Sequence, residues 1–169
     1  MLGDIVFMQG NTIRGAVVRL FETPSGDYSH VGIIVIEKSG VFIIHANPGN
    51  DSRTDRVIKE PWDAVISPRR VTGAAVFRLA HEPTARMVGI LAAGIAQQFE
   101  REALPFDHDF DLMTPQKLYC TELVWRAYMA AGVDLRGDRF GSDRKYLLPS
   151  DLIRSGLLRQ LAMSPGRPR

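Results

Sequence analysis

The stretch Leu118-Tyr119-Cys120-Thr121-Glu122-Leu123-Val124-Trp125 contains the only cysteine of the chain, and the interpretation of the rest depends on it. Upstream, Thr114-Pro115 has the sequence of a helix start, with threonine as N-cap and proline at the first helical position. Apolar residues follow at helical spacing, and Gly132 suits the position just after a helix end. We therefore expect a largely buried helix over about residues 115–131, with Cys120 in one of its early turns.

Cys120 has two interpretations that this stretch alone leaves open. The N-terminus of a helix carries partial positive charge, which favours a thiolate and lowers the pKa of a cysteine placed there. A nucleophilic cysteine needs such an environment. The alternative is structural, because a free cysteine is among the most buried residue types and packs as a small apolar side chain.

The composition is that of a globular protein. The 169 residues are 45% apolar and 24% charged, which suffices for a hydrophobic core. We expect a single domain over residues 1–169, with a flexible tail at 162–169. A net charge of +2 gives no reason to expect nucleic acid as a partner, and no apolar run is long enough for an integral membrane segment.

The single cysteine also bears on the compartment. It excludes an internal disulfide and fits a reducing environment. No signal segment is recognisable in the chain. We therefore expect a cytoplasmic protein, or an exported one if a signal segment before Met1 has been removed.

The spacing of apolar residues predicts an α+β fold. Runs rich in β-branched residues predict strands at residues 4–8, 31–36, 41–46, 64–66 and 74–79. Helical spacing predicts helices at residues 12–21, 84–102 and 115–131, and a short one from about 150. The tight turn Lys38-Ser39-Gly40 joins two of the strands into an antiparallel hairpin. Antiparallel strands followed by helices favour α+β over alternating βαβ units.

Three further segments carry local signals. Residues 51–62 are polar and charged and predict either a loop or an edge strand. Arg69-Arg70 lies between two predicted strands and is interpreted as a solvated turn. Pro149-Ser150-Asp151 predicts the start of the last helix, with Ser150 or Asp151 as its cap.

A thiol nucleophile needs a base, and the chain has four histidines. His30 lies at the entry to a predicted buried strand, where an imidazole is both fixed and accessible. The alternative is a histidine that caps the edge of the sheet. His45 lies at the end of the partner strand. Side chains directly opposite each other on paired antiparallel strands are about 5 Å apart, so with the right register His45 could orient His30 through a ring nitrogen. The alternative for His45 is a polar strand-end residue that faces water.

The two remaining histidines give little support for catalysis. His81 lies between a strand and a helix and is predicted to be on the surface. His108 belongs to the acidic loop 107–111, Asp-His-Asp-Phe-Asp, whose oxygen and nitrogen atoms could bind a metal ion. However, the loop lacks the glycine and distal glutamate of an EF-hand, and no His-Glu-x-x-His or Cys-x-x-Cys spacing occurs. We therefore expect no metal and no cofactor, with Phe106 and Phe110 packed inward.

Several segments together resemble one protein family. They are Gly3-Asp4-Ile5-Val6-Phe7, Tyr28-Ser29-His30-Val31-Gly32-Ile33, Phe106-Asp107-x-x-Phe110, Tyr119-Cys120-Thr121-Glu122-Leu123-Val124 and Leu148-Pro149-Ser150-Asp151-Leu152. Their order resembles that of permuted papain-like proteins of the NlpC/P60 superfamily, in the YiiX/YaeF-like branch. Lecithin:retinol acyltransferase is a more distant relative. The resemblance covers roughly residues 3–156, and its His-Val-Gly and Tyr-Cys-Thr-Glu-Leu-Val segments are the most specific.

The resemblance implies a circularly permuted papain-like fold, in which an antiparallel sheet or small barrel packs against helices. It implies Cys120 as nucleophile and His30 as base, because His30 precedes Cys120 as the permuted order requires. The third polar residue of the family falls on the next strand, where the branch leads us to expect glutamate in a Glu-Ala pair. This chain has His45-Ala46 there, which is closer to the acyltransferase relatives.

The resemblance also implies a reaction. A cysteine-dependent hydrolase would cleave an amide bond through an acyl-enzyme, with His30 sharing the Cys120 proton. The backbone N–H of Cys120 would hold the oxyanion together with a second donor, and Tyr119 and Gln9 are the candidates for this oxyanion or substrate contact. The expected partner is a peptide, amide or lipid-like small substrate, such as a cell-wall peptide or a lipid-linked amide.

Two other functions stay open. A thiol-dependent lipid acyltransferase or esterase is favoured by His45 and by the apolar strands near the site. A catalytically silent binding module would keep the fold without the chemistry, although an intact pair of Cys120 and His30 argues against it.

Overall fold

The structure is a computed structural model that describes residues 1–10, 28–80, 83–137 and 144–164. The described residues form the strands β1 (Ile5–Gly10), β2 (His30–Glu37), β3 (Gly40–Asn47), β4 (Arg56–Pro61), β5 (Val71–Leu79) and β6 (Leu158–Ser164). They also form the helices α2 (Trp62–Val65), α3 (Ala85–Arg101), α4 (Cys120–Ala130) and α5 (Pro149–Arg154). None of these helices is long and apolar enough to cross a membrane. The helix predicted at 12–21, and His81, lie outside the described residues.

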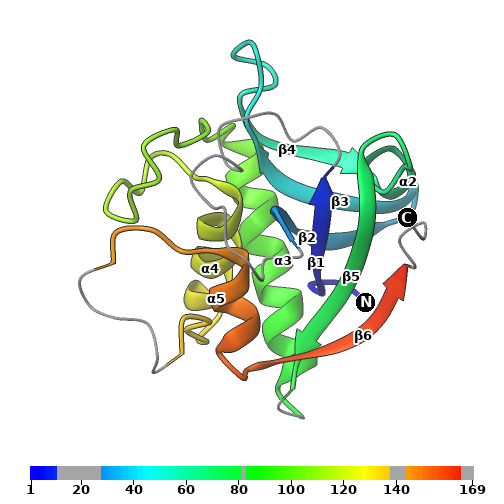
Figure 1. The fold of residues 1–169 in the computed structure, drawn as a ribbon. Helices are drawn as coiled ribbons and strands as arrows, with labels where there is room; N and C mark the ends of the chain where they lie inside the picture. Colours follow the sequence, from blue (N-terminus) through cyan, green and yellow to red (C-terminus); the bar gives the residue numbers. More distant parts are fainter. Residues whose placement is uncertain (11–27, 81–82, 138–143, 165–169) are drawn as a thin grey trace.

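The six strands form one antiparallel sheet in the order β4-β3-β2-β1-β5-β6 (Figure 1). β1 lies inside the sheet, where Phe7 pairs with Val31 of β2 on one side and with Ala75 of β5 on the other. The predicted hairpin is confirmed, since β2 and β3 are joined by a turn in which Glu37 is opposite Gly40. The predicted α+β class is confirmed as well, in the form of a sheet whose edge strands are β4 and β6.

The long helices cover one face of the sheet. α4 packs against β2 and β3, and α3 packs against α4 and the sheet (Figure 1). Alternate strand residues point to this face, among them Phe7 of β1 and Val31 and Ile33 of β2. They meet Leu123 and Val124 of α4, and all five side chains are fully buried. Each large apolar side chain buried in this way stabilises the fold by about 1.5–3 kcal/mol.

The short helix α2 covers the opposite face of the sheet. Val6 and Ile34 point to this face, where Val65 packs with them and Trp62 lies against the same cluster. The strand predicted at 64–66 is therefore wrong, because Val65 ends α2. An apolar run of three residues does not distinguish a strand from a helix by its period. In a helix, the spacing of three residues from Trp62 to Val65 places both side chains on one side.

α4 begins at Cys120, so the helix start predicted at Thr114-Pro115 is wrong. The backbone before Cys120 is extended. The Leu118 N–H donates to the carbonyl oxygen of Pro105 at 3.0 Å, and Tyr119 has φ −97° and ψ 171° as N-cap. Hydrogen bonds to a segment distant in sequence thus override the local helix signal. As a result, Cys120 is the first residue of the helix.

The chain ends in a strand that was not predicted. β6 pairs with β5 and ends at Ser164, so it includes the first three residues of the tail predicted at 162–169; residues 165–169 lie outside the described part. Backbone hydrogen bonds to β5 hold this strand, and such bonds leave little trace in composition. The last helix is confirmed. It begins at Pro149, with Leu148 as N-cap in place of the predicted Ser150 or Asp151.

Candidate active site

Cys120 occupies the first position of α4 and is only 1% exposed. The first six residues of α4 are all buried, because this end of the helix lies between the sheet and α3. The first backbone N–H groups of a helix have no partner within the helix. The sulfur atom of Cys120 is therefore buried close to backbone N–H groups that have no partner within the helix.

β2 and β3 separate next to Cys120. Their paired stretch ends at Ile33 opposite Ile44, and β2 continues beyond it toward its first residue, His30. In this stretch, which pairs with β1 but no longer with β3, the backbone N–H of Val31 faces the Cys120 thiol and acts to lower its pKa. Val31 follows His30 directly in the sequence. The separation of the two strands thus brings the start of α4 to the residue next to the predicted base.

Burial raises the pKa of the Cys120 thiol above its ordinary value. The Thr121 hydroxyl, with Oγ1 3.8 Å from Sγ, acts against this shift, as do the backbone N–H groups of Val31, Thr121 and Cys120. Loss of hydration outweighs these contacts. The backbone N–H groups at the helix start thus act in the predicted direction, but burial dominates, and the pKa of the Cys120 thiol is raised overall.

His30 and His45 are joined by a buried hydrogen bond. Nε2 of His30 lies 2.8 Å from Nδ1 of His45, and the two rings meet edge to face at 87°. The side chains are 4% and 1% exposed, so His45 does not face water, as its structural alternative required. Nδ1 of His30 is also buried and has no hydrogen-bond partner among the described residues. Burial, and then the neighbouring His45, hold the pKa of His30 well below 6.5, so the imidazole is neutral.

Gly32 gives the two histidines the room to meet. It lies across from His45, one residue beyond the paired stretch of β2 and β3. A Cβ atom at Gly32 would lie 2.6 Å from Cγ2 of Ile43, 2.9 Å from the carbonyl oxygen of Ile44 and 3.1 Å from Cβ of His45. These distances are too short for a side chain. The glycine of the His-Val-Gly segment is therefore required by the close approach of β3.

The hydrogen bonds continue from His45 to Glu60 and Arg70. Neither of these two residues was predicted from the sequence as part of the site. Nε2 of His45 lies 3.0 Å from Oε2 of Glu60. The Arg70 guanidinium donates to both carboxylate oxygens, at 2.8 Å to Oε1 and 3.1 Å to Oε2. The hydrogen bond from His45, and then the contacts with Arg70, lower the pKa of Glu60 to about 2. The turn predicted at Arg69-Arg70 is confirmed, and the partly exposed Arg70 side chain binds Glu60 from it.

One sequence signal could have identified Glu60. The edge-strand alternative for residues 51–62 is confirmed by β4, which pairs with β3 so that Glu60 is opposite Ile43. Because side chains alternate along a strand, this register places Glu60 on the same face as His45. The sequence predicted the strand as one of two alternatives but did not specify its register.

Tyr119 and Gln9 each make a polar contact with a residue other than Cys120. The buried hydroxyl of Tyr119 accepts the Leu147 N–H at 2.7 Å, and burial raises its pKa. The exposed Gln9 accepts the Thr72 hydroxyl at 3.0 Å through Oε1, on the side of β1 opposite β2. Neither contact tests a role toward substrate, so these roles stay predictions.

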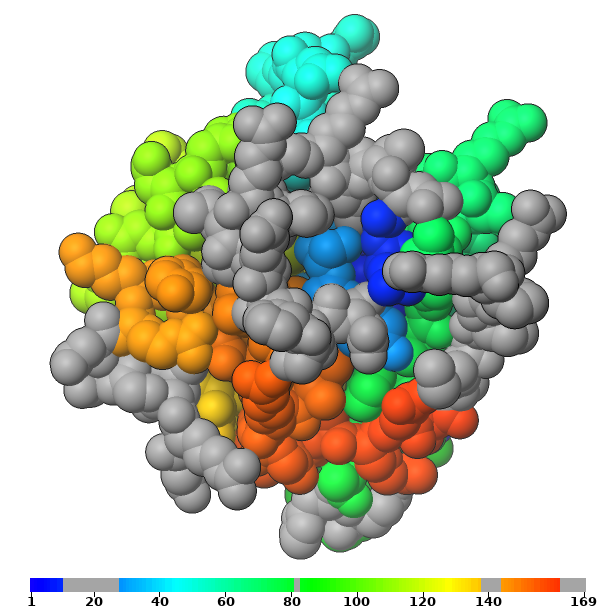
Figure 2. All heavy atoms as spheres, in the orientation of Figure 1, coloured from blue at the N-terminus to red at the C-terminus, as the bar shows by residue number. Residues whose placement is uncertain are grey.

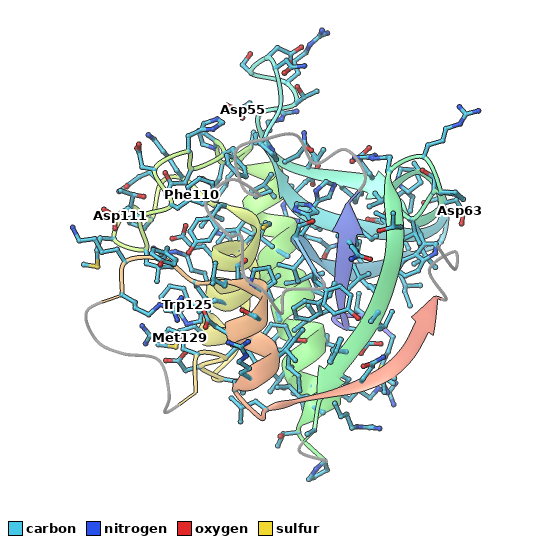
Figure 3. The ribbon with its side chains drawn as sticks, in the orientation of Figure 1. Asp55, Asp63, Phe110, Asp111, Trp125 and Met129 are labelled. Carbon is cyan, nitrogen blue, oxygen red and sulfur yellow. The ribbon has the colours of Figure 1, made fainter. Side chains whose placement is uncertain are left out.

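The acidic loop is organised by its own hydrogen bonds. The carboxylate of Asp107 is fully buried and accepts backbone N–H groups of its loop, while His108 pairs with Asp55 at 2.9 Å. Phe106 and Phe110 are buried as predicted, and Figure 3 shows Phe110 on the side of the loop nearer α4. In the described part of the chain, no group of three or more His, Cys, Asp or Glu side chains is arranged to hold a metal ion.

The surface near the site is formed by the first strands. Figure 2 shows the segment that leads into β2 next to β1. This agrees with the pairing of Met8 with His30 at the same end of the two strands. The described part of the site thus lies at one end of the sheet, where β1 ends and β2 begins.

An antiparallel sheet with a buried cysteine at the start of a helix packed on it is the architecture of papain-like cysteine hydrolases. The family of permuted papain-like amidases called YaeF/YiiX, or C92, matches residues 1–150, and the chain belongs to this family of cysteine peptidases and amidases. The resemblance to the YiiX/YaeF-like branch is thereby confirmed.

Known structures agree on the fold. The crystal structure of the metalloprotein yiiX from Escherichia coli O157:H7 superimposes with a TM-score of 0.74 over 98% of each chain, at 18% sequence identity. At this identity the likeness shows the permuted papain-like fold. A comparison with curated proteins found no match.

Proposed function

We propose that the protein is a cysteine amidase or peptidase in which Cys120 is the nucleophile, His30 the general base and His45 the residue that orients His30. The observation that carries the proposal is the buried hydrogen bond between His30 and His45, beside the Val31 N–H that contacts the thiol. Membership of an amidase family supports the reaction class.

His30 is suited to act through Nδ1. Its Nε2 is engaged by His45, which leaves Nδ1 as the ring nitrogen for the thiol proton. Burial favours the neutral forms of both Cys120 and His30, so we expect the proton to pass from Sγ to Nδ1 while Sγ attacks the carbonyl carbon. The electron pair of the C=O bond moves to oxygen, which gives a tetrahedral oxyanion.

The start of α4 supplies the first donor for that oxyanion. The backbone N–H of Cys120 is the first of the helix and has no partner within it. Tyr119 and Gln9 are the proposed candidates for the second donor or for substrate contact. When the C–N bond breaks, the protonated His30 gives its proton to the leaving amine, and a thioester remains on Cys120. A water molecule, deprotonated by His30, then attacks the thioester carbon; the C–S bond breaks, the acid leaves, and His30 returns the proton to Sγ.

The proposed substrate is a small peptide, amide or lipid-like molecule. One observation favours a second reaction of the same site: a buried histidine, His45, occupies the position where the amidase branch led us to expect glutamate. A thioester on Cys120 can equally be transferred to a lipid hydroxyl, as in an acyltransferase, or formed from an ester. Relative turnover of matched amide and lipid-ester substrates distinguishes these two reactions.

Acylation of Cys120 tests the proposal directly. The protein is incubated with p-nitrophenyl acetate and with aminoacyl p-nitroanilides, and release of the chromophore is followed together with the intact mass. The expected result is a burst of one chromophore per protein and one acyl group on Cys120. Cys120→Ala should abolish the burst and keep the thermal unfolding curve. His30→Ala should lower the burst rate by about 10²-fold or more.

Acylation of another residue, or turnover by Cys120→Ala equal to that of the wild type, would contradict the assignment of the nucleophile. If no probe acylates Cys120 and its thiol reacts as in the unfolded chain, the silent binding module becomes the better description.

A further inference from the structure

The hydrogen-bonded chain that begins at His30 continues past His45 to a carboxylate and a guanidinium at the sheet edge. We propose that Glu60, held by Arg70, is the positioning residue that sets the tautomers of both histidines and so makes Nδ1 of His30 the proton acceptor. The proposal rests on the proposed function, because it assigns how the base of that site is prepared.

The charge of Glu60 fixes the direction of these hydrogen bonds. Glu60 is ionised over the working pH range, because its pKa is lowered to about 2 by His45 and Arg70. An ionised carboxylate only accepts hydrogen bonds. The contact of 3.0 Å between Oε2 and Nε2 of His45 therefore requires a proton on that Nε2.

The tautomer of His45 then decides that of His30. A neutral imidazole has one N–H donor and one acceptor nitrogen, so a proton on Nε2 makes Nδ1 of His45 an acceptor. The contact of 2.8 Å between the rings must then be donated by Nε2 of His30. This leaves the lone pair of His30 on Nδ1, the buried atom without a partner among the described residues.

The opposite set of protons would disable the base. If His45 carried its proton on Nδ1, it would donate to Nε2 of His30, and Nδ1 of His30 would carry the ring proton. A protonated Nδ1 in a neutral ring cannot accept the proton of Cys120. Nothing in the pair of histidines chooses between the two arrangements, so the choice falls to the carboxylate of Glu60.

Arg70 holds the carboxylate in place. Glu60 lies on the edge strand β4 and is partly exposed, so its side chain would otherwise be free to turn toward water. The guanidinium binds both oxygens in a fork, at 2.8 and 3.1 Å, which fixes the plane of the carboxylate and keeps Oε2 on His45. A lysine at this position would keep the charge but lose the fork.

The same sheet offers a matched control. Lys59, the neighbour of Glu60, pairs with Glu37 at 2.7 Å, and this pair has a similar partial exposure. Among the described residues, neither Lys59 nor Glu37 has a hydrogen bond or ion pair with either histidine. Glu37→Gln therefore removes an ion pair from the sheet without touching the chain from His30 to Arg70.

The tautomers are read by two-bond ¹H–¹⁵N NMR of the histidine rings, which distinguishes a proton on Nδ1 from one on Nε2. In the wild type we expect the Nε2–H form for both His30 and His45. In Glu60→Gln the side-chain amide can donate as well as accept, so we expect the Nδ1–H form to appear in both rings. Glu37→Gln should leave the wild-type pattern unchanged.

The rate of Cys120 acylation provides the second readout. We expect Glu60→Gln to lower it by about 10²-fold, the low end of the contribution of a positioned base. Arg70→Lys should cause a smaller loss, and Glu37→Gln none.

Nδ1–H tautomers in the wild type would overturn the proposal. This test needs only the wild type, so it holds even if the variants fail to fold. Wild-type tautomers and rate in Glu60→Gln would overturn it as well. A wild-type rate in Arg70→Lys would remove the role of the guanidinium fork. The outcome is separable from that of the proposed function, because the tautomers are measured without substrate. A failure of the nucleophile assignment would instead appear in Cys120→Ala.

Discussion

Burial decides the resting state of the two reacting side chains. Cys120 and His30 are almost completely buried, and burial shifts the pKa of the thiol upward and that of the imidazole downward. Both shifts favour the neutral form of the group. The site therefore rests as thiol and imidazole rather than as thiolate and imidazolium. A neutral thiol is a poor nucleophile, so the proposed mechanism needs His30 to take the thiol proton as the substrate is attacked.

The pH dependence of alkylation tests this resting state. We expect the rate of reaction of Cys120 with iodoacetamide to inflect above the ~8.5 of a free thiol, because burial raises the pKa of the thiol. The rate is measured by intact mass over a range of pH. The same protein in guanidinium chloride is the control, and its inflection should return to that of a free thiol. An inflection below that value in the folded protein would mean that the ion pair is already formed.

Among the elements, the hairpin of β2 and β3 carries both histidines and sets their distance. Its paired stretch ends at Ile33 and Ile44, and the two strands separate where the Val31 N–H bonds to the thiol. Beyond the paired stretch, Gly32 lets His45 of β3 approach His30 of β2. One hairpin thus carries both the proposed base and the residue proposed to orient it, while α4 carries the thiol.

Substitution of Gly32 tests this arrangement. In Gly32→Ala the new Cβ must displace the β3 backbone at Ile44 or the side chain of His45, because the distances of 2.9 and 3.1 Å leave no room. We expect a loss of stability of about 1–3 kcal/mol, measured by urea unfolding. The acylation rate should also fall, because the two rings are moved apart.

A glycine in α3 provides the control for that substitution. Gly94 lies within the helix, and a Cβ there would meet no atom within 4 Å. Gly94→Ala should therefore stabilise the protein by up to about 1 kcal/mol, since alanine is the better helix former, and leave acylation unchanged. Equal effects of the two substitutions would contradict the steric role of Gly32.

At the scale of the whole molecule, one buried carboxyl group joins α4 to the loop before it. Glu122 is fully buried near the start of α4, and Oε1 accepts Nε of Arg126 at 2.7 Å. Arg126 also donates to the carbonyl oxygen of Leu112 at 2.7 Å. Oε2 of Glu122 has no partner among the described residues. Burial raises the pKa of this group from 4.5 to about 7.

This raised pKa predicts how stability depends on pH. A carboxyl group with a higher pKa in the folded than in the unfolded chain stabilises the fold below the unfolded pKa. That contribution is lost as the pH rises from 4.5 through about 7. In Glu122→Gln we expect this loss to disappear, a difference of about 3 kcal/mol between pH 4 and pH 8 at most. The measurement is urea unfolding of both proteins at the two values.

An exposed carboxylate serves as the control for Glu122. Glu102 follows α3 and is exposed, so Glu102→Gln should leave the pH dependence of the wild type unchanged. If Glu122→Gln kept the same pH dependence as the wild type, the pKa of Glu122 would have to be the same in the folded and the unfolded protein.

The parts of the fold predicted from the sequence are those with strong local signals. The hairpin followed from two runs of β-branched residues around a tight turn, and α3 from its helical spacing. The parts that were wrong depend on distant contacts: α4 begins at Cys120 because the preceding backbone bonds to Pro105, and β6 exists because β5 offers an edge. The YaeF/YiiX family was recognisable because its motifs lie within short segments.

The sequence by itself determined the family, the hairpin and the candidacy of Cys120, His30 and His45, because a motif and a period are local properties of the chain. Only the tertiary structure decided that His30 and His45 share a hydrogen bond. It also decided that the series of hydrogen bonds continues from His45 to Glu60 and Arg70. It also decided that the thiol is neutral at rest. Strand register and burial depend on residues far apart in sequence, and the pKa of a group depends on the hydration that it loses there.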